Sequence, residues 1–312
     1  MKELVLLSGK GGTGKTSLTA AFAHILSSRI LVDADVDAAN LHLITPHSVE
    51  IEEPFSGGIL PVLNPENCTD CGLCREVCAF LAIADTHPPR IDPVRCEGCG
   101  VCAAFCPSKA IRLEPRISGV WFHSRTEKGP LLHARLGIAE ENSGKLVTLL
   151  RKRARALAEK EPCPVILVDG PPGIGCPVIA SMTGADLVLM VTEPTLSGRH
   201  DMLRLADLCT KMGIPACITL NKWDLNPEMT ESMGREAAAR GLFLLSPIPF
   251  DPEVARAMTL GKSLTEVSTG PASQAIRRIW REVEDLLGGT IPASHAMKPF
   301  PMTEGKAEDS CF

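Results

Sequence analysis

The chain has 312 residues, of which 45% are hydrophobic, and a formal net charge of −5. This acidic balance argues against general nucleic-acid binding, which needs a basic surface. No apolar run approaches the roughly 18 residues of a membrane span. The first apolar run, residues 4–7, is too short for the core of a secretory signal. We therefore expect a cytoplasmic protein with no stable membrane association and no nucleic-acid partner.

Short runs rich in Val, Ile and Leu recur along the chain and alternate with helical patterns. Runs without polar alternation are typical of strands that are covered on both faces. The alternation of strands and helices predicts an α/β fold with a doubly wound parallel sheet. A last helix is expected near residues 273–287. The predicted strands are residues 4–7, 30–32, 165–168, 187–191, 216–220 and 242–245.

A phosphate-binding loop follows the first predicted strand. Its sequence fits G-x-x-x-x-G-K-[ST] between a strand and a helix, as a P-loop requires. Glycines let backbone N–H groups surround phosphate oxygens, and the helix N-terminus adds a favourable dipole. Lys15 is expected to reach the β- and γ-phosphates, and Thr16 to ligate Mg²⁺. The predicted nucleotide contacts in this loop are Gly9, Lys10, Gly11, Gly12, Thr13, Gly14, Lys15, Thr16 and Ser17.

The alternation of strands and helices stops after about residue 48 and resumes at residues 117–122. Residues 50–63 are predicted to form a connecting hairpin with Gly57-Gly58 as its turn. Residues 64–114 hold clustered cysteines and few other apolar groups. We therefore predict an insertion at residues 64–114 within a P-loop domain made of residues 1–63 and 115–288. Residues 289–312 are predicted to be a disordered tail, because they lack periodicity.

Eight of the thirteen cysteines lie in two similar runs within this insertion. In a reducing compartment, cysteines are more often metal ligands than disulfide partners. The spacing C-x2-C-x2-C-x3-C, which occurs twice, resembles the bacterial two-cluster ferredoxins, and so predicts a small α+β ferredoxin-like domain with two [4Fe–4S] clusters. In that pattern the fourth cysteine of each run ligates the other cluster. Cluster I is then held by Cys68, Cys71, Cys74 and Cys106, and cluster II by Cys96, Cys99, Cys102 and Cys78.

Zinc is the main alternative for these cysteines. Four-cysteine zinc sites use paired C-x-x-C units that are separated by a longer loop, which two unbroken runs of four do not fit. The few apolar residues of the insertion cannot form much of a core. The clusters are therefore expected to supply most of its folding energy.

The P-loop and three later segments resemble the MinD/ParA superfamily of ATPases, which includes the nitrogenase iron protein. Lys10 matches the early lysine of the deviant Walker A loop, which in that family reaches across a nucleotide-sandwich dimer. Asp35 matches the switch I residue that orients the attacking water, and Asn40 follows at the family's spacing. Asp169 and Gly173 match Walker B and switch II, which implies a water-mediated Mg²⁺ contact and γ-phosphate sensing.

The resemblance implies slow hydrolysis of ATP with Mg²⁺, with Lys10, Lys15 and Asp35 as catalytic residues and a nucleotide-dependent homodimer. Asn221-Lys222-Trp223-Asp224 is expected to recognise the base. In isolation this motif favours guanine, whereas in the MinD family the asparagine contacts adenine. The loop with Pro249 and Asp251 also resembles that family's adenine-side loop, so ATP is favoured over GTP.

Two further features invite a functional interpretation. Cys176 lies at the offset from switch II where the nitrogenase iron protein has a ligand of its bridging cluster. The second ligand position corresponds to Asn142, so a thiol at the dimer interface is favoured over a third cluster. The basic run from Arg151 to Arg155 is predicted to be a solvated helix face rather than a docking site for an acidic protein.

Three functions remain open at this stage. In the first, ATP binding controls electron transfer from two clusters to a redox partner. In the second, the chain is an iron–sulfur carrier or assembly ATPase. In the third, it is a positioning ATPase of the MinD/ParA type with structural or sensory clusters. Complete ligand sets favour the first function, because a cluster carrier usually needs an incompletely ligated cluster.

Overall fold

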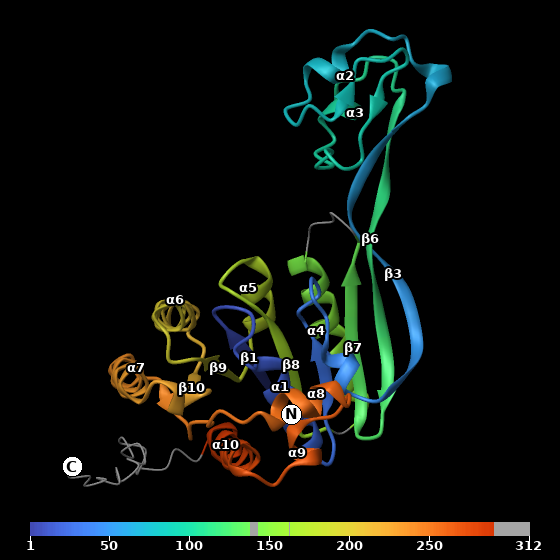
Figure 1. The fold of residues 1–312 in the computed structure, drawn as a ribbon. Coiled ribbons are helices and arrows are strands. Elements are labelled where there is room, and N and C mark those ends of the chain that lie inside the picture. The colour runs from blue at the N-terminus through green and yellow to red at the C-terminus, as the bar shows by residue number, and fades with distance from the viewer. Residues whose placement is uncertain (138–142, 162, 290–312) are drawn as a thin grey trace, which may run out of the picture.

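The computed structural model describes residues 1–137, 143–161 and 163–289 (Figure 1). Within these residues a sheet of nine strands has the order β11-β10-β9-β1-β8-β2-β7-β6-β3. From β11 to β7 each strand runs parallel to its neighbours. All six predicted strands are present in this parallel part. It comprises β1 (Lys2–Ser8), β2 (Ile30–Asp33), β7 (Gly129–Leu136), β8 (Val165–Pro172), β9 (Leu187–Thr192), β10 (Ala216–Leu220) and β11 (Phe243–Leu244).

The parallel strands are apolar on both faces because helices cover both sides of the sheet. Along β1, Val5 and Leu7 face one core, whereas Leu4 and Leu6 face the other. This period of two places neighbouring side chains on opposite faces. The predicted doubly wound α/β architecture is therefore confirmed.

Two groups of helices complete these two cores. On one side, Phe22 of α1 packs edge-on against Trp280 of α10, with ring centroids 5.1 Å apart. No helix in the described ranges is long and apolar enough to cross a membrane. One face carries α1 (Lys15–Ile25), α8 (Glu253–Thr259), α9 (Leu264–Val267) and α10 (Pro271–Leu287). The other carries α4 (Ser143–Lys160), α5 (Cys176–Met182), α6 (Leu196–Met212) and α7 (Pro227–Ala239).

The hairpin predicted for residues 50–63 is wrong. These residues belong to β3 (His47–Leu63), a continuous strand that pairs antiparallel with β6 (Ile111–Thr126). Gly57 and Gly58 lie where the pairing register shifts, not in a turn. Most side chains of β3 are exposed, so its sequence lacks the apolar pattern of a core strand. The two strands extend beyond the parallel sheet as a twisted ribbon, which we call the stalk (Figure 1).

A small lobe lies at the far end of the stalk, away from the helices that cover the parallel sheet (Figure 1). We call residues 64–111 the cysteine lobe, which includes the first residue of β6. Its buried apolar cluster has only three members, Ile83, Cys102 and Ile111. The alternation of strands and helices resumes with β6 at residue 111, earlier than the predicted residue 117. Its elements are η2 (Pro65–Asn67), α2 (Leu73–Glu76), β4 (Ile83–Ala84), β5 (Arg90–Ile91) and α3 (Val101–Ala104). The predicted disordered tail, apart from Gly289, lies outside the described residues.

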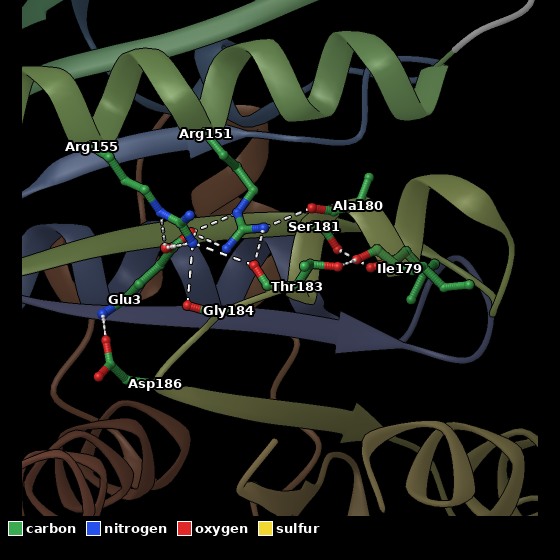
Figure 2. A network of polar contacts seen from close by, with 10 residues as sticks. Glu3, Arg151, Arg155, Ile179, Ala180, Ser181, Thr183, Gly184 and Asp186 are labelled. Carbon is green, nitrogen blue, oxygen red and sulfur yellow. Dashed lines mark hydrogen bonds and ion pairs between the residues drawn. The ribbon is translucent and has the colours of Figure 1, made fainter. Parts of the chain in front are cut away.

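The basic run on α4 is solvated only in part, because Lys152 and Arg153 are exposed whereas Arg151 is buried, which corrects the sequence interpretation. The buried carboxylate of Glu3 on β1 accepts hydrogen bonds from Nε of Arg151 at 2.6 Å and from Nε of Arg155 at 2.8 Å (Figure 2). Arg151 also donates to the carbonyls of Ala180 and Thr183. Arg153 stacks over the ring of Trp121. The run therefore ties α4 to β1 and to the end of α5.

Replacing Glu3 by Gln is expected to lower the free energy of unfolding by about 3–5 kcal/mol. Removing one partner of a buried ion pair leaves its partner charge uncompensated, here the buried guanidinium of Arg151. The matched control is Glu236→Gln, which breaks the more exposed ion pair with Arg199 and is expected to cost less than about 1 kcal/mol. Urea unfolding followed by far-UV circular dichroism measures both. Equal losses would contradict the buried network.

Candidate functional site

The phosphate loop connects β1 to α1, and its path depends on a glycine conformation and on a contact with Asn221. Gly14 has φ +90°, and a Cβ there would lie 2.4 Å from Nδ2 of Asn221, so only glycine fits. Nδ2 of Asn221 donates to the Thr13 carbonyl at 2.8 Å and closes the loop against the end of β10. The buried hydroxyl of Thr13 has no hydrogen-bond partner among the described residues. A phosphate oxygen is an acceptor that this hydroxyl could use.

Asp169, in the second half of β8, is the centre of the site. Its fully buried carboxylate accepts hydrogen bonds from Nζ of Lys15 at 2.9 Å and from the hydroxyl of Thr16 at 2.6 Å. Thr19 donates a third bond at 2.9 Å. The two predicted Mg²⁺ ligands, Thr16 and Asp169, are thus brought into direct contact. The sequence interpretation missed Thr19, which lies one helical turn after Lys15 and was detectable only as a threonine on the buried face of α1.

The side chain of Lys10 contacts residues of the same chain, just after β9. Its Nζ donates to the hydroxyls of Thr195 at 3.4 Å and Ser197 at 3.1 Å. It also lies 3.9 Å from one carboxylate oxygen of Glu193. The other oxygen of Glu193 lies 2.6 Å from Nζ of Lys222. Lys10 must leave these groups to reach a nucleotide on another chain. Sequence analysis missed Glu193, because no motif marks the residue.

The segment after β2 is held by Asp33 rather than by helix capping alone. The fully buried carboxylate of Asp33 accepts from the backbone N–H groups of Asp35, Asn40 and Leu41. Burial and the neighbouring Asp169 raise the pKa of Asp33. Asp35 is only partly buried, and burial raises its pKa although Lys15 opposes this shift. The side chain of Asn40 is exposed beside this segment.

Gly173 follows β8 with φ +93°, a conformation that favours glycine. Its N–H donates to the Ser8 carbonyl at 2.9 Å, which joins the segment after Asp169 to the start of the phosphate loop. Sensing of a γ-phosphate by this N–H would require that hydrogen bond to open.

The two loops predicted to surround the base are connected to each other. A carboxylate oxygen of Asp224 accepts from the backbone N–H of Phe250 at 2.7 Å. Asp251 accepts from the N–H of Glu253 at the start of α8. Pro249 is partly buried in the same loop, and Ser17 of α1 donates to the sulfur of Met258 on α8. The predicted base-side residues therefore converge near the phosphate loop.

Two cavities in the cysteine lobe gather the eight predicted cluster ligands. Each cavity takes three cysteines from one run and the fourth from the other, which is the predicted pairing. The first, with an empty volume of ≈ 300 Å³, is lined by Cys68, Cys71, Cys74 and Cys106. The second, of ≈ 340 Å³, is lined by Cys78, Cys96, Cys99 and Cys102.

Backbone N–H groups point at sulfur atoms in both halves of the lobe. The N–H groups of Asp70 and Gly98 lie 3.4 Å from the sulfurs of Cys68 and Cys96. Those of Ala82 and Ala110 lie 3.4 and 3.3 Å from Cys78 and Cys106. Such donors stabilise thiolates that ligate a cluster. Among the described residues, no three His, Cys, Asp or Glu side chains are close enough to hold a single metal ion.

The remaining described cysteines lie outside the lobe. Cys209 and Cys217 are buried, and burial raises the pKa of Cys209 to about 11. Cys163 is partly buried. Cys176 is exposed at the start of α5, close to Gly144. Asn142, the matching position for a second bridging ligand, lies outside the described residues.

Comparisons with known proteins agree with this geometry. The family model for the CobQ/CobB/MinD/ParA nucleotide binding domain matches residues 4–264. The uncharacterised protein MJ0578 of Methanocaldococcus jannaschii is 30% identical over 289 residues, which cover 91% of this chain and 97% of that protein. MJ0579 of the same organism is 28% identical over 250 residues, which cover 72% of this chain and 83% of that protein.

Solved structures share the fold at lower identity. The cell division ATPase MinD of Pyrococcus furiosus has a TM-score of 0.55 and 19% identity, with 91% of this chain and 99% of that chain covered. MinD in the MinC:MinD complex of Aquifex aeolicus has a TM-score of 0.56 and 20% identity, with 96% and 99% covered. The fold is therefore that of a MinD-like P-loop NTPase. These comparisons show neither an inserted ferredoxin domain nor a relationship to the nitrogenase iron protein.

Proposed function

Because the chain belongs to the CobQ/CobB/MinD/ParA nucleotide-binding family, we propose that it is a cytoplasmic ATPase in which ATP-dependent dimerisation controls electron transfer through two [4Fe–4S] clusters. One observation carries this proposal. A complete phosphate site and two four-cysteine cavities lie on the same chain, joined by the stalk. The physiological partner is then a redox protein.

The hydrolytic part of the proposal rests on the groups around Asp169. On ATP binding, Lys15 would leave Asp169 for the phosphates, because its buried ammonium lies directly after the phosphate loop. Thr16 would then hold Mg²⁺, and Asp169 would contact it through water. Asp35 orients the attacking water, a role that needs position more than covalent chemistry. Burial raises the pKa of Asp35, and the neighbouring Asp169 adds to this shift.

ATP is the proposed nucleotide rather than GTP. Guanine recognition by the Asn221–Asp224 motif would use the carboxylate of Asp224. That carboxylate instead accepts the N–H of Phe250 and holds the two base-side loops together. Mg-ADP is the ligand of MinD from Pyrococcus horikoshii, which shares this fold. Adenine would then lie beside Asn221, Pro249 and Asp251.

Dimerisation is proposed from the position of Lys10. Its contacts with Thr195 and Ser197 are weak, partly exposed hydrogen bonds that a phosphate could replace. A charged contact with phosphate is stronger than one with a neutral hydroxyl. ATP on a second copy of this chain would therefore draw Lys10 across the interface.

The iron–sulfur part of the proposal is supported by the two cavities. A zinc ion would need four sulfurs at about 2.3 Å from one centre. In a [4Fe–4S] cubane each of the four cysteines binds a different iron atom, so its ligands lie farther apart. Each cavity also has a full set of four cysteines. When bound, the clusters would supply one-electron chemistry, and the chain would supply thiolates and N–H donors.

Two functions other than electron transfer are compatible with the same residues. An iron–sulfur carrier or assembly ATPase would use the same cysteines, but full ligand sets disfavour easy release of a cluster. A positioning ATPase of the MinD/ParA type would leave the clusters structural or sensory. Likeness to MinD shows the fold alone, because the identities are near 20%.

The test uses the anaerobically purified holoprotein and its Lys10→Ala variant. We expect about eight irons per chain in both, since each [4Fe–4S] cluster holds four. In the wild type, ATP is expected to produce a dimer and to change the rate at which reduced clusters pass electrons to a soluble acceptor. Lys10→Ala is expected to remove the dimer and that change. Sedimentation velocity and stopped-flow absorbance measure the two effects.

Lys211→Ala is the control, because it removes an exposed lysine of α6 that lies outside the phosphate loop and the base-side loops. Iron well below this content, or colourless protein, would sink the iron–sulfur proposal. Transfer of clusters to an apo-ferredoxin at the rate of ATP hydrolysis would favour the carrier function instead.

A further inference from the structure

The two halves of the cysteine lobe repeat each other in local geometry. Asp70 and Gly98, each two residues after the first cysteine of its run, both have positive φ, at 55° and 66°. Gly72 and Gly100 match in the same way, at 75° and 77°. The N–H to sulfur contacts recur at equivalent positions. By themselves, the two cluster sites would therefore be nearly equivalent.

The stalk breaks this equivalence, because its two strands run along the second cysteine loop and reach the first only at their tip. A Cβ on Gly98 would lie 2.3 Å from the carbonyl oxygen of Ile59 on β3, so the second loop lies directly on the stalk. A Cβ on Gly100 would lie 3.3 Å from the side chain of Leu113 on β6. Arg116 of β6 donates to the carbonyl of Cys96 at 3.0 Å. The second loop is thus enclosed by both strands.

The first loop meets the stalk only at its tip, where Leu63 and Ile111 line the cavity of its cysteines. At the position of Gly98 it carries Asp70, whose exposed side chain pairs with His87 within the lobe. A Cβ on Gly72 would meet only the end of the Arg75 side chain, at 4.0 Å. Asp tolerates positive φ, but its side chain needs free space, which the first loop has and the second lacks. The loop from Cys68 to Cys74 is therefore less closely covered by the stalk than the second loop.

The two halves of the lobe also differ in charge. Residues 64–87 contain four carboxylates and one arginine, and all four carboxylates are exposed: Glu66, Asp70, Glu76 and Asp85. Residues 88–114 contain three carboxylates and four basic residues. The outward half is acidic, whereas the half against the stalk is slightly basic.

We infer that the cluster held by Cys68, Cys71, Cys74 and Cys106 is the outer one, and that a redox protein with a basic surface docks on the acidic loop beside it. This inference rests on the proposed function. The reduced outer cluster would give one electron to the oxidised centre of that partner, and no bond would be made or broken. Opposite charges steer such encounters and raise association rates by about 10- to 10³-fold, an effect that salt screens.

Cytochrome c, a basic haem protein, serves as the probe. The dithionite-reduced holoprotein is mixed with ferric cytochrome c, and haem reduction is followed by stopped flow at several salt concentrations. The outer variant is Glu66→Lys with Glu76→Lys. The matched inner variant, Glu97→Lys with Glu114→Lys, makes the same change in charge on the half near the stalk. All four side chains are exposed.

At low salt, the outer variant is expected to reduce cytochrome c about tenfold more slowly than the wild type and to lose the salt dependence. The inner variant is expected to stay within about twofold of the wild type. Equal effects of the two variants, or no effect of the outer one, would overturn the inference. Iron content and the electron paramagnetic resonance spectrum of each variant show that the clusters are intact. Protein without clusters would refute the proposed function, whereas intact clusters with equal rates would refute only the docking surface.

Discussion

Removal of iron from the holoprotein is expected to unfold the cysteine lobe and to leave the parallel sheet folded. The lobe buries only Ile83, Cys102 and Ile111 as a cluster, which is far too little to offset its chain entropy. No disulfide is present among its eight cysteines, which are all free thiols. Small domains of this kind depend on metal for folding. The parallel sheet has two large cores of its own and needs no such support.

Hydrogen exchange with and without an iron chelator, under anaerobic conditions, measures this effect. Peptides from residues 68–110 are expected to exchange at the rate of unstructured chain after chelation, including the N–H groups of Ala82 and Ala110 that contact sulfur. Peptides from β1, β8 and β9 are expected to keep their protection. The result that contradicts the prediction is a lobe that stays protected without iron.

Cysteine variants separate ligands from ordinary thiols. Cys71→Ser and Cys99→Ser, one in each cavity, are each expected to lose up to half of the iron and to weaken protection of the lobe. Cys176→Ser is the matched control, because Cys176 is equally exposed but lies outside the lobe. A loss of iron in Cys176→Ser would show that the ligand assignment is incomplete.

Asp169→Asn is expected to reduce ATP hydrolysis by about 10²-fold or more, the size that follows from losing a group that stabilises the transition state electrostatically. Asp169 accepts three hydrogen bonds, and an amide can neither match them nor bring a negative charge to Mg²⁺. The increase in nucleotide affinity that Mg²⁺ produces is expected to vanish as well. Phosphate release and titration of a fluorescent ATP analogue, with and without Mg²⁺, measure the two effects.

Asp37→Asn is the control for this experiment. Asp37 is an exposed carboxylate on the segment that carries Asp35, so its loss is expected to change hydrolysis by less than about threefold. Urea unfolding shows whether each variant remains folded. Normal Mg²⁺-dependent binding in folded Asp169→Asn would rule out the proposed role of Asp169.

The sequence by itself determined the features that depend on short segments. Six buried strands were predictable, because apolar side chains must alternate between two covered faces. The phosphate loop was predictable since its glycines, Lys15 and Thr16 act within one turn between a strand and a helix. The grouping of the cysteines also followed from spacing, and the two cavities gather the same sets. In each case the interacting residues are close in the chain or repeat a fixed pattern.

Only the tertiary structure decided which distant residues meet. β3 was mistaken for a hairpin, because its stability comes from pairing with β6 and not from an apolar face. Arg151 and Arg155 looked solvated, yet they bind Glu3, about 150 positions earlier in the chain. The difference between the two cysteine loops is likewise invisible in their near-identical spacing. It arises where the stalk lies on Gly98 and leaves Asp70 in solvent, because close packing by a distant strand leaves no trace in local sequence.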